Sequence, residues 1–128
     1  MLTKKESYNV AVVGATGIVG ESLLDILYSR RFPISSIHAV ASTKSKGSKA
    51  KFGDQLLTVE SLDEFNFTDI DIAFFSAGSS VSKEYATKAT TQGCIVIDNT
   101  SEFRYEKDIP LVVPEVNPQD IDLYKHKN

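Results

Sequence analysis

The sequence has 128 residues, which suits one compact domain that buries about two thirds of the surface exposed by its unfolded chain. A formal net charge of -3 and a hydrophobic content of 41% are those of an ordinary globular protein, and neither suggests a nucleic-acid partner. The first apolar run is too short for a signal peptide or a membrane span, so we expect a cytoplasmic protein with no membrane contact.

The first predicted elements are a strand and a helix. Residues 8–13 form a β-branched apolar run that ends at Gly14, which is typical of a strand buried on both faces of a parallel sheet. An amphipathic helix is predicted next, terminated by Pro33, because apolar residues recur at helical spacing: Val19, Leu23, Ile26 and Leu27. Residues 36–42 then predict a second strand.

The middle of the chain continues this alternation. A lysine-rich loop runs through Lys49, and residues 52–55 predict a turn between two short strands. Residues 71–75 predict a third buried strand. Ser79 or Ser80 is expected to cap the second helix that follows.

This second helix is predicted to run to about Gln92, with Gly93 placed to end it. Residues 94–98 then predict a fourth buried strand, residues 109–114 suggest another strand limited by prolines, and residues 120–127 begin a last helix. Because strands and helices alternate, we predict an α/β fold: a Rossmann-like, doubly wound, mainly parallel sheet with flanking helices.

A glycine-rich turn lies between the first strand and the first helix. Residues 14–20 have a G-x-x-G-x-x-G pattern, in which small residues let backbone N–H groups approach a pyrophosphate at the positive end of a helix. Gly20 stands inside the helix, where glycine costs about 1 kcal/mol relative to alanine, so we expect close packing there. The alternative is a turn that merely happens to be glycine-rich, but its place directly after a buried strand favours a dinucleotide site.

The end of the second strand bears on the choice between NAD and NADP. NAD-binding proteins generally place an acid about 20 residues beyond the glycines, where it binds the ribose 2′-hydroxyl. This chain instead has Ser42, Thr43 and Lys44, followed by Lys46, and these groups suit a 2′-phosphate. The sequence therefore favours NADP, with the alternative that the lysines only solvate a loop.

Two further turns follow buried strands, at the edge where ligands of open α/β sheets bind. The small residues after the third strand let a nucleotide lie close to the backbone: Ser76, Ala77 and Gly78. Asn99 follows the fourth strand and is also expected beside the cofactor. Arg104 is a candidate for binding a phosphate or carboxylate, with a structural salt bridge to Glu102 or Glu106 as the alternative.

Four stretches of the sequence together resemble the aspartate-semialdehyde dehydrogenase family. They extend over essentially the whole chain, at residues 12–20, 74–82, 96–104 and 110–117. The resemblance implies that residues 1–128 are the NAD(P)-binding domain of an NADP-dependent enzyme, a homodimer or homotetramer at full length. That enzyme reduces L-aspartyl 4-phosphate with NADPH to L-aspartate 4-semialdehyde and phosphate, an early step toward lysine, threonine and methionine.

The resemblance also assigns roles to residues. It implies that Arg104 holds the substrate phosphate and that residues 76–78 lie beside the cofactor. It assigns the pyrophosphate to residues of the glycine turn: Gly14, Thr16, Gly17, Ile18 and Val19. Lys44 stands where many relatives have an arginine, so the charge is kept but the bidentate fork is lost.

No residue of this chain is expected to be catalytic. In the family a cysteine thiolate attacks the acyl phosphate and a histidine is the acid/base, and the segment with that cysteine would begin beyond Asn128. The single cysteine, Cys94, starts an apolar strand and is expected to be buried and structural. His38 and His126 share no metal-ligand motif, so no metal site is expected.

Because two helices are too few to cover a parallel sheet, we expect the chain to be the N-terminal part of a longer enzyme and to be inactive alone.

Other interpretations stay open. The N-acetyl-γ-glutamyl-phosphate reductase family shares the fold and the chemistry, although residues 74–82 and 111–117 favour the aspartate enzyme. A short-chain dehydrogenase needs a Tyr-x-x-x-Lys pair, which none of the 5 tyrosines provides. A non-catalytic nucleotide-binding Rossmann module is the third alternative, and calorimetry with NADPH and NADH distinguishes a purely structural one, which binds neither.

Overall fold

A parallel sheet of five strands forms the centre of the molecule, in the order β5-β2-β1-β6-β7. The structure is a computed structural model and describes residues 2–125. The strands span Tyr8–Val13 (β1), Ile34–Ala41 (β2), Glu60–Ser61 (β5), Ile72–Phe75 (β6) and Ile95–Asp98 (β7). The predicted Rossmann-like, mainly parallel sheet is therefore confirmed, and β5 is the strand that the sequence did not reveal.

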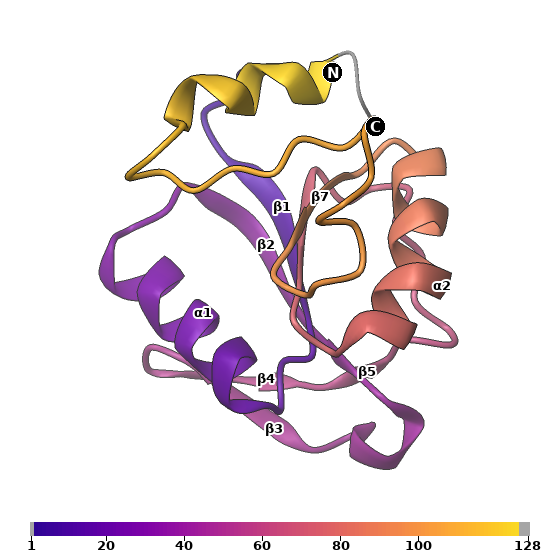
Figure 1. Cartoon of the computed structure of the whole chain (residues 1–128). Coiled ribbons are helices and arrows are strands. Elements are labelled where there is room, and N and C mark those ends of the chain that lie inside the picture. The colour runs from indigo at the N-terminus through magenta and orange to yellow at the C-terminus, as the bar shows by residue number, and fades with distance from the viewer. Residues whose placement is uncertain (1, 126–128) are drawn as a thin grey trace.

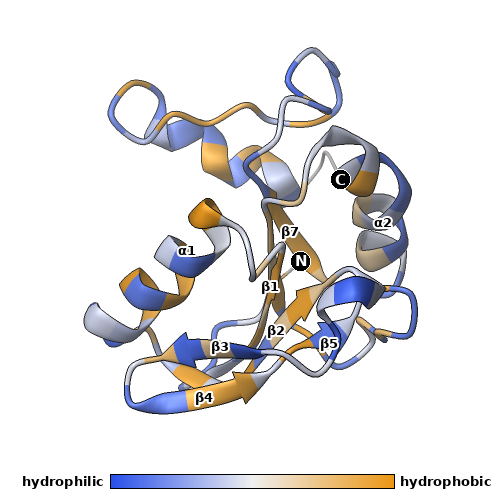
Figure 2. Cartoon of the chain, turned by 90° about the horizontal axis from the view of Figure 1, so that it is seen from below, coloured by the Kyte–Doolittle hydropathy of each residue, from blue (hydrophilic) through white to orange (hydrophobic). Residues whose placement is uncertain are grey.

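Helices lie on both faces of the sheet (Figure 1). Helix α1 (Ile18–Ser29) follows β1 and covers one face, and α2 (Ser79–Thr91) follows β6 and covers the other. The hairpin of β3 (Lys49–Phe52) and β4 (Gln55–Thr58) is antiparallel and lies beside α1 (Figure 2). This hairpin confirms the predicted turn at residues 52–55. Two 3-10 helices, η1 (Thr43–Ser45) and η2 (Pro118–Lys125), complete the described elements.

The core lies on both sides of β1, because successive side chains of a strand point to opposite faces. Val10 and Val12 pack with Leu24 of α1 on one side, whereas Ala11 and Val13 pack on the side of α2. These last four residues of β1 are fully buried. The predicted strand buried on both faces is therefore confirmed.

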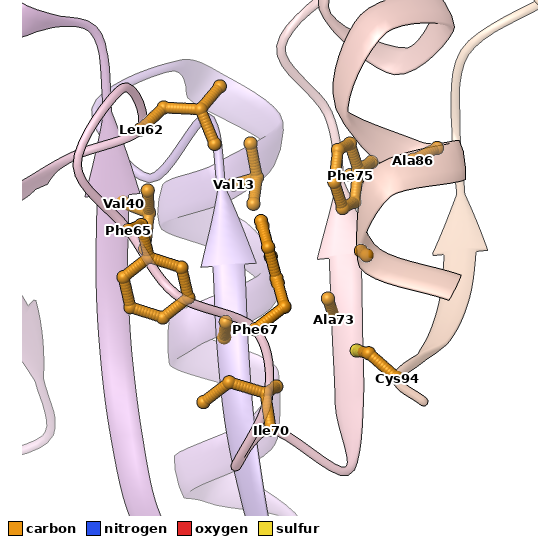
Figure 3. Close-up of a cluster of buried hydrophobic side chains, with 12 residues drawn as sticks. Val13, Val40, Leu62, Phe65, Phe67, Ile70, Ala73, Phe75, Ala86 and Cys94 are labelled. Atoms are coloured by element: carbon orange, nitrogen blue, oxygen red, sulfur yellow. The ribbon is translucent and has the colours of Figure 1, made fainter. Parts of the chain in front are cut away.

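A loop of aromatic residues covers much of the sheet on the α2 side. Phe65 and Phe67 meet edge to face, with ring centroids 4.9 Å apart, and Phe67 stacks on Phe75 of β6 (Figure 3). This loop on the α2 side and the β3–β4 hairpin on the α1 side add to the cover that the two helices give the sheet. The sheet is therefore better covered than its two helices alone would allow. On the edge strand β7 the side chain of Ile97 is 48% exposed.

The C-terminal segment departs from the prediction. Residues 109–114 form no strand, because Pro110 and Pro114 have no N–H to donate to a ladder. The Asn117 side chain bonds this segment instead: its Oδ1 accepts from Val113 N at 2.7 Å and its Nδ2 donates to the Leu111 carbonyl at 2.8 Å. The predicted last helix is the 3-10 helix η2, and residues 126–127 of that prediction lie outside the described residues.

The helices themselves also differ in detail. On α1, the predicted apolar positions Val19 and Ile26 are each 44% exposed, whereas Gly20 and Leu24 are buried, so the buried face is rotated from the expected one. On α2, the N-cap is Gly78, with φ at +96°, and no side chain caps the helix. Ser79 is instead the first helical residue, so the predicted serine cap was wrong. The helix ends at Thr91, and Gly93 follows with φ at +92°, as predicted for a helix stop.

Candidate functional site

The glycine turn at the carboxyl end of β1 has a shape set by backbone contacts. Gly14 has φ at +92°, a conformation that glycine adopts without strain. The amides of Gly14 and Ala15 both donate to the Val40 carbonyl, at 2.8 and 3.2 Å, and Gly17 N donates to the Gly14 carbonyl at 3.1 Å. A side chain at Gly20 would collide with that same Gly14 carbonyl, which confirms the close packing expected there.

The first turn of α1 presents backbone amides to solvent. Gly17 is the N-cap and no side chain caps the helix. No acceptor within residues 2–125 takes the amides of Ile18 and Val19, and residues 16–19 are exposed. Figure 2 shows this apolar helix start standing clear of the strands. Unpaired N–H groups at the positive end of a helix form a site suited to a phosphate group.

The parallel register brings the other predicted turns to the same edge. Val13 pairs with Val40 and Phe75, and Phe75 pairs with Asp98, so Ser42, Ser76 and Asn99 all follow strand ends at one level. A Cβ at Gly14 would lie 2.8 Å from the Ser76 carbonyl carbon, which means that the turns after β1 and β6 are in backbone contact. Ala77 and Gly78 continue from there into α2. The structure thus gathers the predicted cofactor residues along the carboxyl edge of the sheet.

The turn after β2 is built differently, because side chains determine its contacts. Ser42 and Lys44 are exposed, and their side chains form no hydrogen bond or ion pair with residues 2–125. Thr43 Oγ1 lies 3.1 Å from Ser61 Oγ and donates to Asp63 Oδ2 at 3.0 Å. Lys46 Nζ lies 2.7 Å from Glu64 Oε2. Of the four side chains predicted to bind the 2′-phosphate, Ser42 and Lys44 are therefore available to a ligand, whereas Thr43 and Lys46 already have partners.

Asp63 connects this turn to helix α2. Its Oδ1 accepts from the Tyr85 hydroxyl at 2.7 Å, while its Oδ2 accepts from Thr43. The Tyr85 hydrogen bond, then that of Thr43, and the nearby Lys88 charge hold the pKa of Asp63 below its ordinary value of 3.8, against a smaller opposing effect of burial. The same Asp63 hydrogen bond raises the pKa of Tyr85 to about 12. The carboxylate is therefore ionised and its two oxygens are oriented.

Asp98 organises the turn after β7. Its Oδ1 accepts from Ser82 Oγ at 3.0 Å and from Thr100 N at 2.9 Å, and its Oδ2 accepts from Thr100 Oγ1 at 3.0 Å. Ser82 lies on α2 and is fully buried. Asn99 N donates to the Phe75 carbonyl at 2.9 Å, which joins the same turn to β6. These bonds fix the backbone on which Asn99 is carried.

Arg104 follows this turn on an exposed segment. Its Nη2 lies 3.5 Å from the Asn99 carbonyl oxygen, at the limit of a hydrogen bond. Within residues 2–125 it forms no ion pair with Glu102 or Glu106, so the alternative of a structural salt bridge is not realised. The neighbouring Phe103 packs against the α2-side core and anchors the segment. The guanidinium is therefore open to an anionic ligand.

The remaining candidate groups are structural. Cys94 is only 2% exposed, and burial, with the Asp71 charge, raises the pKa of its thiol to about 12. His38 Nδ1 lies 2.8 Å from Glu60 Oε2, and His126 lies outside the described residues. Over residues 2–125 no cluster of three or more potential metal ligands occurs, and no helix is long and apolar enough to cross a membrane.

Sequence reasoning missed Asp63 and Tyr85. Asp63 comes after a strand of only two residues, and Tyr85 lies six residues inside α2, so neither stands in a recognisable motif. The pairing of Ala41 with Ser61 brings the β5 end beside the β2 end. The acid that the sequence lacks directly after β2 is thus present beside it in space.

Comparison with known proteins identifies the family. Residues 9–124 match the family model described as the semialdehyde dehydrogenase, NAD binding domain. The chain belongs to this family. An aspartate-semialdehyde dehydrogenase of Rickettsia typhi is 54% identical to it over 127 residues, in an alignment that covers 99% of this chain and 37% of that relative.

Solved structures of semialdehyde dehydrogenases have the same fold. Aspartate semialdehyde dehydrogenase II of Vibrio cholerae, complexed with ASA, matches with a TM-score of 0.90 at 45% identity, over 94% of this chain and 40% of that one. The Candida albicans enzyme with NADP matches with a TM-score of 0.76 at 31% identity, over 91% of this chain and 36% of that one. This semialdehyde dehydrogenase domain therefore spans well under half the length of the relatives it matches.

Proposed function

We propose that the chain is the NADP-binding part of an aspartate-semialdehyde dehydrogenase. In this proposal the complete enzyme reduces L-aspartyl 4-phosphate with NADPH to L-aspartate 4-semialdehyde and phosphate. The similarity to the Rickettsia typhi and Vibrio cholerae proteins over nearly the whole chain supports this reaction. NADPH would supply the hydride, and residues of this chain would hold and orient the nucleotide.

One observation carries the proposal: the exposed amides at the start of α1 belong to the same glycine turn as Gly14, and Gly14 is in backbone contact with the turn after β6. Residues 16–19 would enclose the diphosphate, and the N–H groups of Ile18 and Val19 would donate to it, because they lack partners within residues 2–125 and the helix dipole favours an anion. Gly14 allows the Ser76 backbone to approach, so that Ser76, Ala77 and Gly78 would line the cofactor on its other side. Asn99 would lie farther along the same edge.

The preference for NADP is proposed to rest on Ser42 and Lys44. Both side chains are exposed and without a partner in the described chain, so a ribose 2′-phosphate would find a hydroxyl and an ammonium group there. Thr43 was expected to join them, but its hydroxyl donates to Asp63. We therefore assign Thr43 to the shape of the turn and Ser42 and Lys44 to the phosphate.

The nucleophile is proposed to come from a part of the enzyme outside these 128 residues. Cys94 is the only thiol of the chain, and its burial and raised pKa keep it protonated and out of reach of a substrate. Arg104, which is exposed and free of acidic partners in the described chain, would hold the substrate phosphate. The chain thus contributes binding and orientation.

Two measurements test the proposal. Calorimetry of the complete protein should detect NADPH binding, and an assay with aspartate semialdehyde, phosphate and NADP in the reverse direction should detect NADPH formation. The 128-residue chain should give no turnover. Binding of neither NADPH nor NADH to the complete protein would refute a nucleotide site, and turnover by the 128 residues alone would refute the assignment of the nucleophile.

A further inference from the structure

The carboxylate of Asp63 lies beside the turn to which the ribose 2′ position of the cofactor is assigned. β5 pairs with the end of β2 through Val40 and Ala41, and Leu62 N donates to the Ala41 carbonyl at 2.8 Å. Asp63 follows directly and accepts the Thr43 hydroxyl at 3.0 Å. An acid therefore stands next to the β2 end although none follows β2 in the sequence.

The hydrogen-bonding capacity of these groups limits what they can offer a ligand. A threonine hydroxyl has one hydrogen, and Thr43 gives it to Asp63, so it has none left for a phosphate dianion, which only accepts. A carboxylate has about four acceptor positions, and Asp63 uses one for Thr43 and one for Tyr85. Asp63 can therefore accept a further hydroxyl but repels a phosphate.

A second acid, Glu64, follows Asp63 and reduces the positive charge available to a phosphate. Glu64 lies 2.7 Å from Lys46 and neutralises one of the two lysines that the sequence offered to the phosphate. Lys44 is then the one basic side chain of residues 42–46 that has no partner in the described chain. With Asp63 and Glu64 beside it, the turn at residues 42–46 is much closer to electrical neutrality than its lysine-rich sequence indicates.

We infer that Asp63 is a specificity-determining residue that limits the preference of this site for NADPH over NADH. It withdraws Thr43 from the 2′-phosphate, keeps a negative charge beside it, and can accept the 2′-hydroxyl of NADH. Tyr85 holds the carboxylate in this orientation through its 2.7 Å hydrogen bond. The inference rests on the proposed function, because it requires that the site binds a nicotinamide nucleotide.

The test compares dissociation constants for NADPH and NADH in the complete protein and its Asp63→Asn variant. The amide keeps the size of the side chain and removes its charge. We expect the NADPH-to-NADH ratio of dissociation constants to shift about two- to fivefold in favour of NADPH, since charges at exposed positions interact modestly. The shift should shrink at high salt, a response that a purely structural role would not produce. Because both nucleotides are measured on one preparation, a lower folded fraction does not alter the ratio.

Two variants serve as controls. Asp54→Asn makes the same charge change in the β3–β4 turn, beside Tyr28 at the far end of α1, and should leave the ratio unchanged. Tyr85→Phe removes one hydrogen bond of Asp63 but keeps the charge, so it should move the ratio less than Asp63→Asn.

Three results would overturn the inference. The first two are an unchanged ratio in Asp63→Asn and an equal loss of affinity for both nucleotides in that variant. The third is a shift of the ratio in Tyr85→Phe as large as that in Asp63→Asn. The last would mean that the order of the turn, and not the charge, sets the ratio. If the unmodified protein bound neither nucleotide, the proposed function would fail first, and this outcome is distinct from the other three.

Discussion

The turns after β1 and β2 lie side by side at the same edge of the sheet, yet different parts of the chain determine them. The first is shaped by its own backbone, through the left-handed Gly14 and amides that bond the Val40 carbonyl. The second takes its properties from side chains that bond residues 61–64, about 20 positions along the chain. A backbone site can be recognised from a local pattern, whereas a side-chain site depends on what the fold brings beside it.

The largest effect should come from changing the backbone turn itself. Gly20→Ala places a methyl group against the Gly14 carbonyl, so we expect a loss of about 3 kcal/mol in the free energy of unfolding. Gly17→Ala is the matched variant, because a Cβ there lies 3.5 Å from the Gly14 oxygen and φ is -85°. Denaturant unfolding should separate the two variants. Equal stabilities would contradict the close contact between α1 and the turn.

The turn after β7 combines backbone and side-chain contacts. A change in this turn should therefore cause an intermediate loss in the free energy of unfolding. Asp98→Ala leaves the buried Ser82 hydroxyl and the Thr100 amide without their acceptor, which costs on the order of 1–3 kcal/mol. Denaturant unfolding measures this loss. Ser101→Ala, which removes only an exposed hydroxyl 3.2 Å from Ser79, is the control and should change the free energy of unfolding little. A similar loss in both variants would speak against the Asp98 network.

The β2 turn should respond through affinity and not through stability. Lys44→Ala is expected to weaken NADPH binding about tenfold and to leave NADH binding unchanged, because one charge-assisted hydrogen bond to the phosphate is lost. Lys46→Ala should have a smaller effect, since its ammonium group already pairs with Glu64. Calorimetry on the complete protein tests both. A stronger effect at Lys46 would reverse the assignment.

The smallest effect concerns the opposite edge of the sheet, where Asp71 accepts from Lys5 Nζ at 2.6 Å and from Asn9 N at 2.8 Å. Burial disfavours the Asp71 charge, but these two hydrogen bonds outweigh it and lower the pKa below 3.8. The ionised group therefore stabilises the fold above pH 3.8, and this contribution is lost as the pH falls through the lowered value. Asp71→Asn should be less stable than the unmodified protein at pH 6 by about 1 kcal/mol. The difference should vanish in acid, and a difference that persisted there would rule out the charge as its cause.

The same contrast explains what the sequence could predict. The strands at residues 8–13 and 72–75 and the glycine turn follow from local composition, because apolar runs and glycines determine their own conformation. Residues 109–114 were predicted wrongly, since an apolar run does not reveal that two prolines and the Asn117 amide replace the ladder bonds of a strand. Asp63 was missed for the related reason that its contacts depend on β5, a strand of only two residues. The roles of the predicted site residues remain predictions.

A crystal structure of the complete protein with NADPH would test the central claim most directly. We predict that the amides of Ile18 and Val19 donate to the diphosphate and that Ser42 and Lys44 contact the 2′-phosphate. A nucleotide bound elsewhere, with the glycine turn empty, would contradict it.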